Sequence, residues 1–457
     1  MKTLTMKFGG TSVGSPEAIH SVVNIVTEEV ERSSRVVVVV SAMNGVTDAL
    51  IGSVREAAAG NRWGYLSCSQ KLRDRHAEAL HLLTAPGGDR DGVLAEIDRL
   101  LAQHVELCNA VNTLGEATPR ISDAVIAFGE RISSRVVAAA LRTHGIKAQA
   151  LDASSMIVTD EQFGSAVPIW DTTEANIRAR LLPLLDSGVV PVITGFIGAT
   201  RTGQVTTLGR GGSDYSGAIF AACTDSDELV IWTDVDGVMT TDPRIDKRAR
   251  VLPSISYTEV GELAFYGAKV LHPKTVQPIL RRGIPVRVRN TFNPTHPGTL
   301  IEAASEPSDT VIKAVTCVHS VSLLTVGGRG MIGVPGIAGR TFLATAQAGA
   351  NILMISQASS EQSFCFVITH DRVEAAEEAI RAELAKEIER EDVETVDVLR
   401  EVAVVTVVGS GMRGTPRRRA RVRRRWARTS SMWWRLRRDH PSAASRFRGR
   451  GNEPDQR

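Results

Sequence analysis

Hydrophobic residues over positions 1–300 follow two alternating spacings. Residues 35–41 (RVVVVVS) form a nearly unbroken β-branched run, which is typical of a strand buried on both faces. Residues 189–196 and 228–233 are two further short apolar strands. Residues 16–32 begin with a proline suited to a first helical turn, and their apolar positions recur at helical spacing. Strands alternating with helices predict a mainly parallel sheet between two helical layers, a three-layer α/β/α domain.

Two stretches depart from this alternation. Residues 46–115 are mostly polar with helical spacing, broken by PGG at 86–88, and predict a helical lobe inserted into the first domain. Asn-Pro, Pro-Gly and Glu-Pro pairs cluster between residues 293 and 310. Because such pairs punctuate structure, they predict a domain boundary there and a first domain at residues 1–300.

Beyond residue 310 the pattern describes a smaller α+β domain at residues 311–390. It predicts the order strand, helix, strand, strand, helix at residues 315–326, 337–347, 352–356, 364–369 and 373–386. The string LTVGGRGMIGVP at 324–335 is echoed by VTVVGSGMRGTP at 405–416. We therefore expect a second copy of this unit to begin at residues 400–416, before apolar periodicity ends.

Charge divides the chain unevenly. The formal net charge is +3 over 457 residues, but residues 417–457 contain fifteen Arg and three acidic residues. That segment carries +12, which leaves −9 for the rest of the chain. No apolar run approaches the roughly 20 residues of a bilayer span, and no apolar leader opens the chain. We therefore expect a cytoplasmic protein without a membrane segment. The five cysteines are widely spaced, so we expect neither disulfides nor a zinc site.

Two glycine-rich loops carry candidate chemistry. KFGGTS at residues 7–12 places a lysine on a strand end beside two glycines and two hydroxyls, which suits phosphoryl oxygens. TLGRGGSDYS at residues 207–216 places Arg210 between glycines, where a guanidinium can hold a carboxylate. The alternatives are an ordinary strand-to-helix turn for the first loop and an N-cap by Ser213 or Asp214 for the second. A cap does not explain Arg210.

Two further strings are weaker signals when taken alone. TDVDGV at residues 233–238, followed by TTDPR at 240–244, sits at a strand's carboxyl end, where open α/β sheets bind ligands. Asp-Gly and Asp-Pro also form ordinary turns. GAKVLHP at residues 267–273 contains Lys269, a second candidate phosphate ligand, although a lone lysine is usually a surface charge.

Taken together, these strings resemble the aspartokinase family within the amino-acid-kinase superfamily. SAMNGVTD at residues 41–48 and FGER at 128–131 extend the match, and all seven strings follow the family's order over residues 6–300. The resemblance implies ATP-dependent phosphorylation of the side-chain carboxylate of L-aspartate, with Mg²⁺, at the head of the lysine, threonine and methionine pathway. Such a transfer needs positioning and charge neutralisation rather than a protein nucleophile or a general base.

The resemblance also assigns roles residue by residue. It implies catalytic roles for Lys7, Asp214 and Lys269. It implies an aspartate pocket formed by Thr47, Glu130, Arg210, Gly211, Gly212 and Ser213. It implies that the nucleotide is held by Lys7, Gly9, Gly10, Thr233, Asp234, Met239, Arg244, Lys269 and Val270. Met239 departs from the family's frequent tyrosine, so we expect altered nucleotide affinity rather than lost activity. No protein metal ligands are predicted.

Residues 311–390 resemble an ACT domain of ferredoxin-like βαββαβ form, carried by GMIGVPGIA at 330–338 and NILMISQASSE at 351–361. The resemblance implies a threonine or lysine effector, with Asn351 and Gln357 as candidate contacts, and a homodimer through paired ACT regions. These two residues could instead cap elements of a packing module. The family normally has two ACT units. We therefore hypothesise that the Arg-rich residues 417–457 are out of frame; a basic arm for nucleic acid is the alternative.

Three other functions compete with the aspartokinase interpretation. Another amino-acid kinase would act on glutamate, acetylglutamate, carbamate or a nucleotide, which the GRGGSD loop and the ACT segment disfavour. A catalytically silent amino-acid sensor is disfavoured by the presence of Lys7, Arg210, Asp214 and Lys269. The third is the kinase half of a bifunctional enzyme with homoserine dehydrogenase: we do not expect this chain alone to be that enzyme, although its parent gene could have encoded it.

Overall fold

The computed structural model describes residues 2–32, 35–268, 271, 273–303, 312–357 and 362–409. These residues form two compact units, the first made of residues 2–314 together with 408–409 and the second of residues 315–407. Each unit is described by itself. Lys269, Val270 and the Arg-rich segment 417–457 lie outside the described residues, as do residues 410–416 of the expected second repeat.

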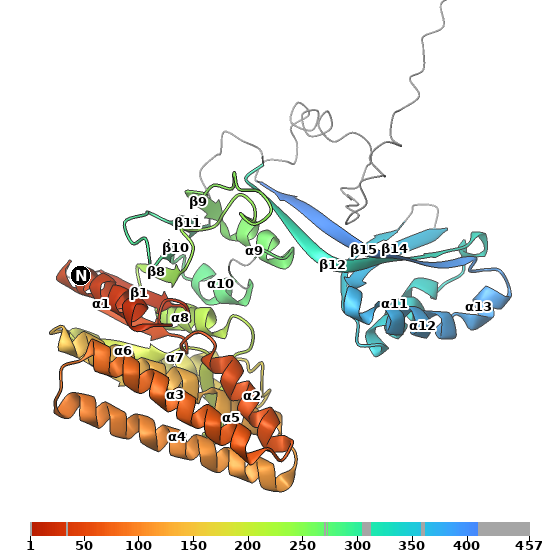
Figure 1. The fold of residues 1–457 in the computed structure, drawn as a ribbon. Coiled ribbons are helices and arrows are strands. Elements are labelled where there is room, and N and C mark those ends of the chain that lie inside the picture. Colours follow the sequence, from red (N-terminus) through yellow and green to blue (C-terminus); the bar gives the residue numbers. More distant parts are fainter. Residues whose placement is uncertain are drawn as a thin grey trace, which may run out of the picture. The chain divides into compact units, whose positions relative to one another are not determined.

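The first unit is built on an eight-stranded sheet (Figure 1). Its strands, in spatial order, are β3 (Ala148–Leu151), β5 (Val190–Thr194), β2 (Arg35–Val40), β1 (Thr3–Phe8), β8 (Glu228–Thr233), β10 (Val286–Asn290), β11 (Thr299–Glu302) and β9 (Ser254–Ser256). The strands from β3 to β10 are parallel, whereas β11 runs antiparallel to β10. The β-branched run of β2 is almost wholly buried because helices cover both faces.

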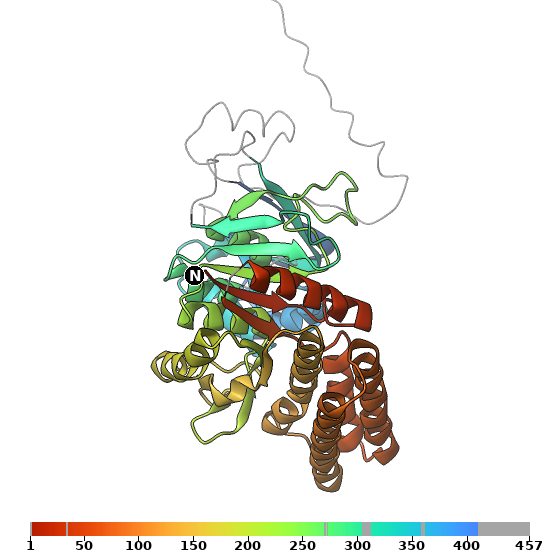
Figure 2. The same ribbon diagram turned by 90° about the vertical axis from the view of Figure 1, so that its left-hand side faces the viewer.

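Helices pack on the two faces of this sheet (Figure 2). One face carries α1 (Pro16–Glu31) and α6 (Phe128–Thr143), and the other carries α7 (Trp170–Asp186), α8 (Gly212–Cys223) and α10 (Pro273–Leu280). The short helix α9 (Tyr257–Phe265) packs beside α10 and strands β9 and β11. The three-layer α/β/α arrangement predicted from the sequence is confirmed.

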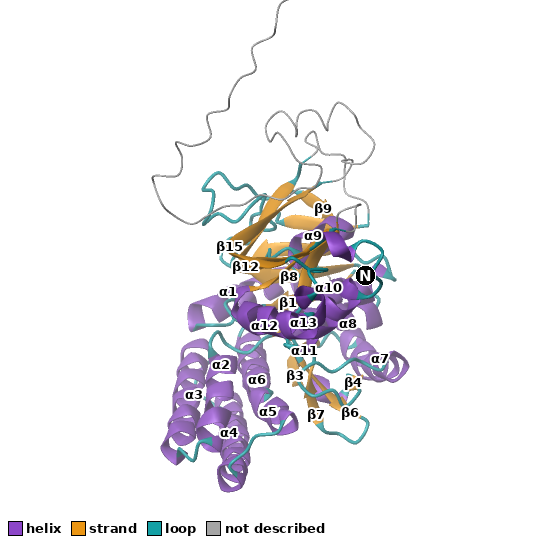
Figure 3. Ribbon diagram, turned by 90° about the vertical axis from the view of Figure 1, so that its right-hand side faces the viewer, coloured by secondary structure: helices purple, strands orange, loops and turns teal. Residues whose placement is uncertain are grey.

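A helical lobe follows β2. It consists of α2 (Val46–Ala58), α3 (Arg62–Leu83), α4 (Gly88–Leu114) and α5 (Pro119–Ile126), which run beside one another in Figures 1 and 3. These helices span the stretch expected to be helical at residues 46–115. A small second sheet, in the order β4 (Val158–Thr159), β6 (Ile197–Thr200) and β7 (Val205–Thr207), lies near α5.

The second unit is an α+β domain. Its sheet has the order β13 (Ile352–Gln357), β14 (Ser363–Thr369), β12 (Ala314–Gly327) and β15 (Thr395–Val408). Helices α11 (Ile337–Gln347), α12 (Val373–Glu383) and α13 (Ala385–Glu389) pack on one face of it (Figure 1). With β15 as the last strand, the order is the βαββαβ of a ferredoxin-like domain, which confirms the predicted α+β class.

Three details differ from the sequence patterns. The Asn-Pro and Pro-Gly pairs at residues 293–298 lie in the turn between antiparallel β10 and β11, and the first compact unit continues to Ala314. The helix expected at 373–386 is divided at Leu384 into α12 and α13. Residues 400–408, expected to open a second repeat, belong to β15, which is continuous from Thr395. Turn-forming pairs and β-branched runs mark local structure but do not say which unit it joins.

Candidate active site

A cavity of about 690 Å³ opens in the first unit, where the loops after β1 and β2 meet the start of α8. The carboxyl ends of parallel strands bring these loops together. The backbone N–H of Ser41 donates to the Phe8 carbonyl (3.1 Å), and that of Asn44 donates to the Gly10 carbonyl (3.0 Å). The lining residues are Lys7, Gly10, Ser41, Ala42, Met43, Asn44, Gly45, Thr47, Asp48, Pro119, Ser122, Asp123, Ile126, Glu130, Gly164, Phe196, Thr207, Gly209, Arg210, Gly211, Gly212, Ser213 and Asp214.

Lys7 and Asp214 form an ion pair in this cavity. Lys7 is near the end of β1 and Asp214 is in the first turn of α8, and Lys7 Nζ lies 2.5 Å from Asp214 Oδ1. The Lys7 side chain is only 9% exposed and that of Asp214 20%. The carboxylate therefore holds a nearly buried ammonium in place at the cavity wall, where an anionic ligand would meet it.

The start of α8 is shaped by glycines. Gly209 and Gly211 have φ of 75° and 72°, in the left-handed region that glycine adopts without strain. Gly211 is the N-cap of α8, and no side chain caps the helix, so the capping role considered for Ser213 and Asp214 is wrong. The Gly212 N–H donates to the Gly209 carbonyl (2.9 Å), so the N–H groups of Ser213 and Asp214 are the ones at this helix end that can face a ligand, and a helix N-terminus favours anions. A Cβ on Gly212 would lie 2.6 Å from Phe196 Cδ2.

Glu130 is a buried carboxyl group in the first turn of α6. It is 3% exposed, and its Oε2 has no hydrogen-bond partner among the described residues. Burial raises the pKa of Glu130 to about 8, against the opposing effects of backbone hydrogen bonds and the charge of Lys7. A buried carboxyl with a free oxygen in a cavity can accept hydrogen bonds from a ligand ammonium, which would also favour its ionised form.

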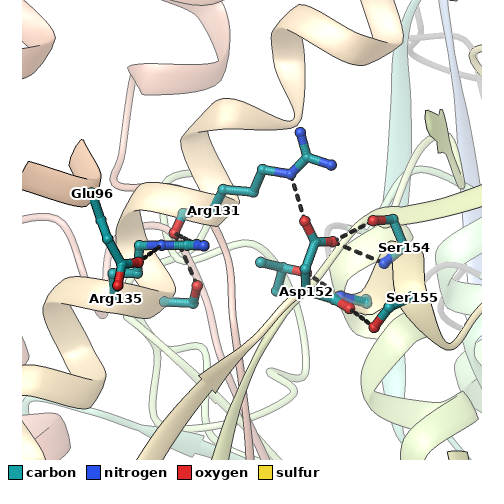
Figure 4. A network of polar contacts seen from close by, with 9 residues as sticks. Glu96, Arg131, Arg135, Asp152, Ser154 and Ser155 are labelled. Carbon is teal, nitrogen blue, oxygen red and sulfur yellow. Dashed lines mark hydrogen bonds and ion pairs between the residues drawn. The ribbon is translucent and has the colours of Figure 1, made fainter. Parts of the chain in front are cut away.

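A polar network fixes the start of α6 beside Glu130 (Figure 4). Arg131 Nε donates to Asp152 Oδ2 (2.6 Å), just after β3. Asp152 Oδ1 accepts from the Ser154 N–H (2.9 Å) and hydroxyl (2.6 Å). Arg135, one turn along α6, pairs with Glu96 of α4 (2.6 Å). These contacts join α6 to the sheet and to the helical lobe, and so position the turn that carries Glu130.

The other residues predicted for the substrate pocket also line the cavity. Thr47 is half-buried in the first turn of α2, and Ser213 is half-buried in α8. Arg210 is exposed and forms no ion pair with any described residue. Its guanidinium is therefore free to bind a carboxylate in the cavity.

Of the residues predicted to hold the nucleotide, Lys7 and Gly10 line the cavity. Thr233 ends β8 and its hydroxyl donates to Asp234 (3.2 Å). Met239 is half-buried in an isolated bridge with Val251, and Arg244 is exposed and paired with Asp242 (2.6 Å). None of these lines the cavity. Gly9 does not line it either, but its N–H donates to the Trp232 carbonyl (3.0 Å) and joins the first glycine loop to the end of β8.

Asp123 and Phe196 are two of the cavity residues that the sequence reasoning missed. Asp123 of α5 is 2% exposed and accepts hydrogen bonds from the N–H groups of Gly164 (2.8 Å) and Thr207 (2.9 Å) and from the Thr207 hydroxyl (2.8 Å). Burial raises its pKa despite these donors. Phe196 has φ of 68°, which is uncommon for a non-glycine residue and is often found at functional sites. Neither residue stands in a recognisable motif.

In the second unit, Asn351 precedes β13 and Gln357 ends it, and both are exposed. The His, Cys, Asp and Glu residues of the described part of the chain form no group of three or more that could hold a metal ion. None of its helices combines the length and the apolar character that crossing a bilayer requires.

Comparison with known proteins places this geometry in a family. Residues 2–290 match the amino acid kinase family, and residues 324–384 match an ACT domain. The chain is 32% identical over 417 residues to the chloroplastic aspartokinase 1 of Arabidopsis thaliana, covering 89% of this chain and 70% of that protein. The chain belongs to the aspartokinase family.

Other aspartokinases are similar as well. The chloroplastic bifunctional aspartokinase/homoserine dehydrogenase 1 of Arabidopsis thaliana is 35% identical over 416 residues, which cover 90% of this chain and 45% of that protein. The chain thus spans about half the length of the bifunctional relatives it matches. Two structures of Escherichia coli aspartokinase III, one with lysine and aspartate and one with aspartate and ADP, align at 29% identity and a TM-score of 0.72. Each alignment covers 90% of this chain, and it covers 87% of the first solved chain and 88% of the second.

Proposed function

We propose that this chain phosphorylates the side-chain carboxylate of L-aspartate with ATP, giving 4-phospho-L-aspartate and ADP. The observation that carries the proposal is the cavity itself, which combines a nearly buried ammonium with a guanidinium and a buried carboxyl oxygen that have no partner among the described residues. The similarity to an aspartokinase solved with aspartate and ADP supports the same pair of ligands here.

The cavity offers one partner for each charge of aspartate. Arg210 would bind the α-carboxylate through paired N–H donors, and the ionised Glu130 would accept from the α-ammonium. Thr47 and Ser213 would contribute hydroxyl hydrogen bonds. With both ends held, the side-chain carboxylate is left to face the transferred phosphoryl group. Glutamate, one methylene longer, would place its carboxylate out of line.

Charge neutralisation would be the main catalytic contribution. A carboxylate oxygen of aspartate attacks the γ-phosphorus, and the bond from that phosphorus to the β,γ-bridging oxygen breaks as ADP leaves. The acceptor is ionised at pH 7, so no proton has to be removed. Lys7, the N–H groups of Gly10 and the start of α8 would stabilise the negative charge on the phosphoryl oxygens. Thr233, Asp234, Met239, Arg244, Lys269 and Val270 remain proposed nucleotide contacts.

Magnesium fits this donor set as a companion of the nucleotide. Mg²⁺ is usually held by one or two protein carboxylates together with substrate phosphates and water. Among the residues that the structure describes, Asp214 is the carboxylate nearest to the Lys7 ammonium in the cavity, and it can supply one such ligand. When bound, Mg²⁺ would add positive charge on the phosphates.

The ACT domain would bind an effector amino acid, threonine or lysine, with Asn351 and Gln357 as contacts, and would pair in a homodimer. Support comes from the ACT match and from the similar Escherichia coli enzyme solved with lysine. Titration calorimetry with each amino acid, together with sedimentation of the full chain, would test this. If neither amino acid gave a heat of binding, the effector proposal would be refuted, while the proposed catalytic activity would be unaffected.

A further inference from the structure

Arg75 connects the helical lobe to two loops of the cavity wall. It lies on α3, and its guanidinium donates two hydrogen bonds across the chain. Nη1 donates to the Asn44 carbonyl (2.8 Å) and Nη2 donates to the Gly14 carbonyl (2.8 Å). Arg75 does not line the 690 Å³ cavity, but both loops that it contacts reach the cavity wall.

The two loops that Arg75 joins are the first glycine loop, residues 9–15, and the loop after β2, residues 41–45. Near the strands they are already connected by the Asn44 N–H to Gly10 carbonyl bond. Arg75 adds a second connection farther along, at Gly14, just before α1, and at Asn44, just before α2. It therefore links the segments that carry Gly10 and Thr47 into the cavity.

This contact depends on the shape of a guanidinium. Its planar fork presents parallel N–H donors that reach two carbonyls at once, whereas a lysine ammonium is a compact point charge on a flexible stem. Hydrogen bonds from a charged donor are shorter and stronger than neutral ones. Within the described chain Arg75 forms no ion pair, so its charge serves these backbone carbonyls rather than a carboxylate.

We propose that Arg75 is a positioning residue for phosphoryl transfer, which holds the first glycine loop and the loop after β2 at a fixed separation. The proposal rests on the proposed kinase function. Each loop keeps its own ligand contacts without Arg75, but their relative placement loosens. Because in-line transfer depends on alignment, this loosening would lower kcat more than it raises either KM.

The test compares Arg75→Lys with Arg73→Lys in the full chain. Arg73 is on the same helix, two residues away, and pairs with Asp98 at the surface through Nε (2.7 Å) and Nη2 (3.2 Å). We expect Arg75→Lys to lower kcat about 10- to 100-fold, with both KM values within about threefold of wild type. Arg73→Lys keeps kcat within about twofold, as expected for an exposed pair.

Hydrogen exchange separates this inference from the proposed function. In Arg75→Lys, and not in Arg73→Lys, the amides of residues 9–15 and 41–45 should exchange faster, whether or not the protein is active. A wild-type protein without kinase activity would refute the proposed function, while the exchange comparison would still decide whether Arg75 restrains the loops. An active Arg75→Lys with wild-type kcat and wild-type exchange would overturn the positioning role.

Chemical rescue provides a second variant. Arg75→Ala should lose kcat further and regain part of it when guanidinium chloride is added at a concentration far below that which denatures the protein. Sodium chloride at the same ionic strength should not restore it. Equal responses to the two salts would show that the site does not require a guanidinium and would overturn the proposal.

Discussion

Lys7 Nζ and Asp214 Oδ1 are in contact at 2.5 Å, joining the central strand β1 to the first turn of α8. Few lysines are so buried, and burial of a charge is costly unless it is paired. Asp214 neutralises the charge of Lys7. A bound phosphoryl group would share the ammonium, so the pair can hold Lys7 in place before and during catalysis.

Removing the ammonium should abolish most of the activity. For Lys7→Met we expect kcat to fall about 10²- to 10³-fold, because one preorganised charge at the transferred group is lost. Lys2→Met is the matched control, since Lys2 is half-exposed just before β1 and pairs at the surface with Glu228 (3.2 Å). Steady-state kinetics of both variants check this. Lys7→Met with kcat within threefold of wild type would exclude Lys7 from the transfer step.

The ionisation of Glu130 should govern aspartate binding. Its pKa of about 8 means that it is largely protonated at pH 7, whereas the aspartate ammonium prefers the carboxylate. We therefore expect KM for aspartate to fall as pH rises from 6.5 to 8, and Glu130→Gln to show a higher KM that hardly varies over this range. Initial rates measured against aspartate concentration at several pH values give this KM for both proteins. A pH-independent wild-type KM would contradict the role of Glu130.

The same group should make the protein less stable at alkaline pH. Between the ordinary glutamate value of 4.5 and about 8, folded Glu130 holds a proton that the unfolded chain has released. Because the folded state binds more protons, the free energy of unfolding falls as pH rises through this interval. Glu130→Gln, which carries no ionisable proton, should flatten this dependence. Urea unfolding at pH 6 and pH 8.5 tests it, and parallel curves for the two proteins would exclude the effect.

A methyl group at Gly212 should displace the start of α8. The added Cβ would lie 2.6 Å from Phe196 Cδ2, and Phe196 is itself held in a left-handed conformation. We expect Gly212→Ala to lower kcat/KM about 10²-fold, since small displacements at a transfer site are costly. Gly261→Ala in α9 is the control, because its Cβ would meet no atom within 4 Å. Equal kinetics for the two variants would show that the Gly212–Phe196 approach does not position α8.

The buried pair of Lys313 and Glu259 should contribute to stability of the first unit. Lys313 Nζ lies 3.1 Å from Glu259 Oε2, and the side chains are 3% and 6% exposed. Lys313→Met should reduce the free energy of unfolding by about 3 kcal/mol, because it leaves a buried carboxylate without this partner. Adding Glu259→Gln should recover part of the loss. If the loss in the free energy of unfolding of the double variant equals the sum of the losses of the two single variants, the residues are not coupled.

The sequence indicated those features whose cause is local. The β-branched run of β2 and the apolar spacing of α1 and α11 depend on neighbouring residues, and their bounds were found to within a few residues. The glycine loops were recognised because a cationic side chain stands beside glycines in each, and the structure adds that Gly209 and Gly211 have left-handed backbone, which glycine adopts without strain.

Long-range contacts were not visible in the sequence. Asp123 is tied to Gly164 and Thr207, and Arg75 to Gly14 and Asn44, by hydrogen bonds that depend on how α5 and α3 pack. Neither residue type nor spacing signals them. The burial that raises the pKa of Glu130 likewise arises only when α6 closes against the loop after β2.

Aspartate-dependent formation of an acyl phosphate is the most direct test of the central claim. Mg-ATP, L-aspartate and hydroxylamine would be incubated with the full chain, and the hydroxamate measured, with L-glutamate and Lys7→Met as controls. The account predicts hydroxamate with aspartate, and far less with glutamate or with the variant. No hydroxamate from folded wild-type protein that binds ATP and aspartate would contradict it and leave amino-acid sensing as the better description.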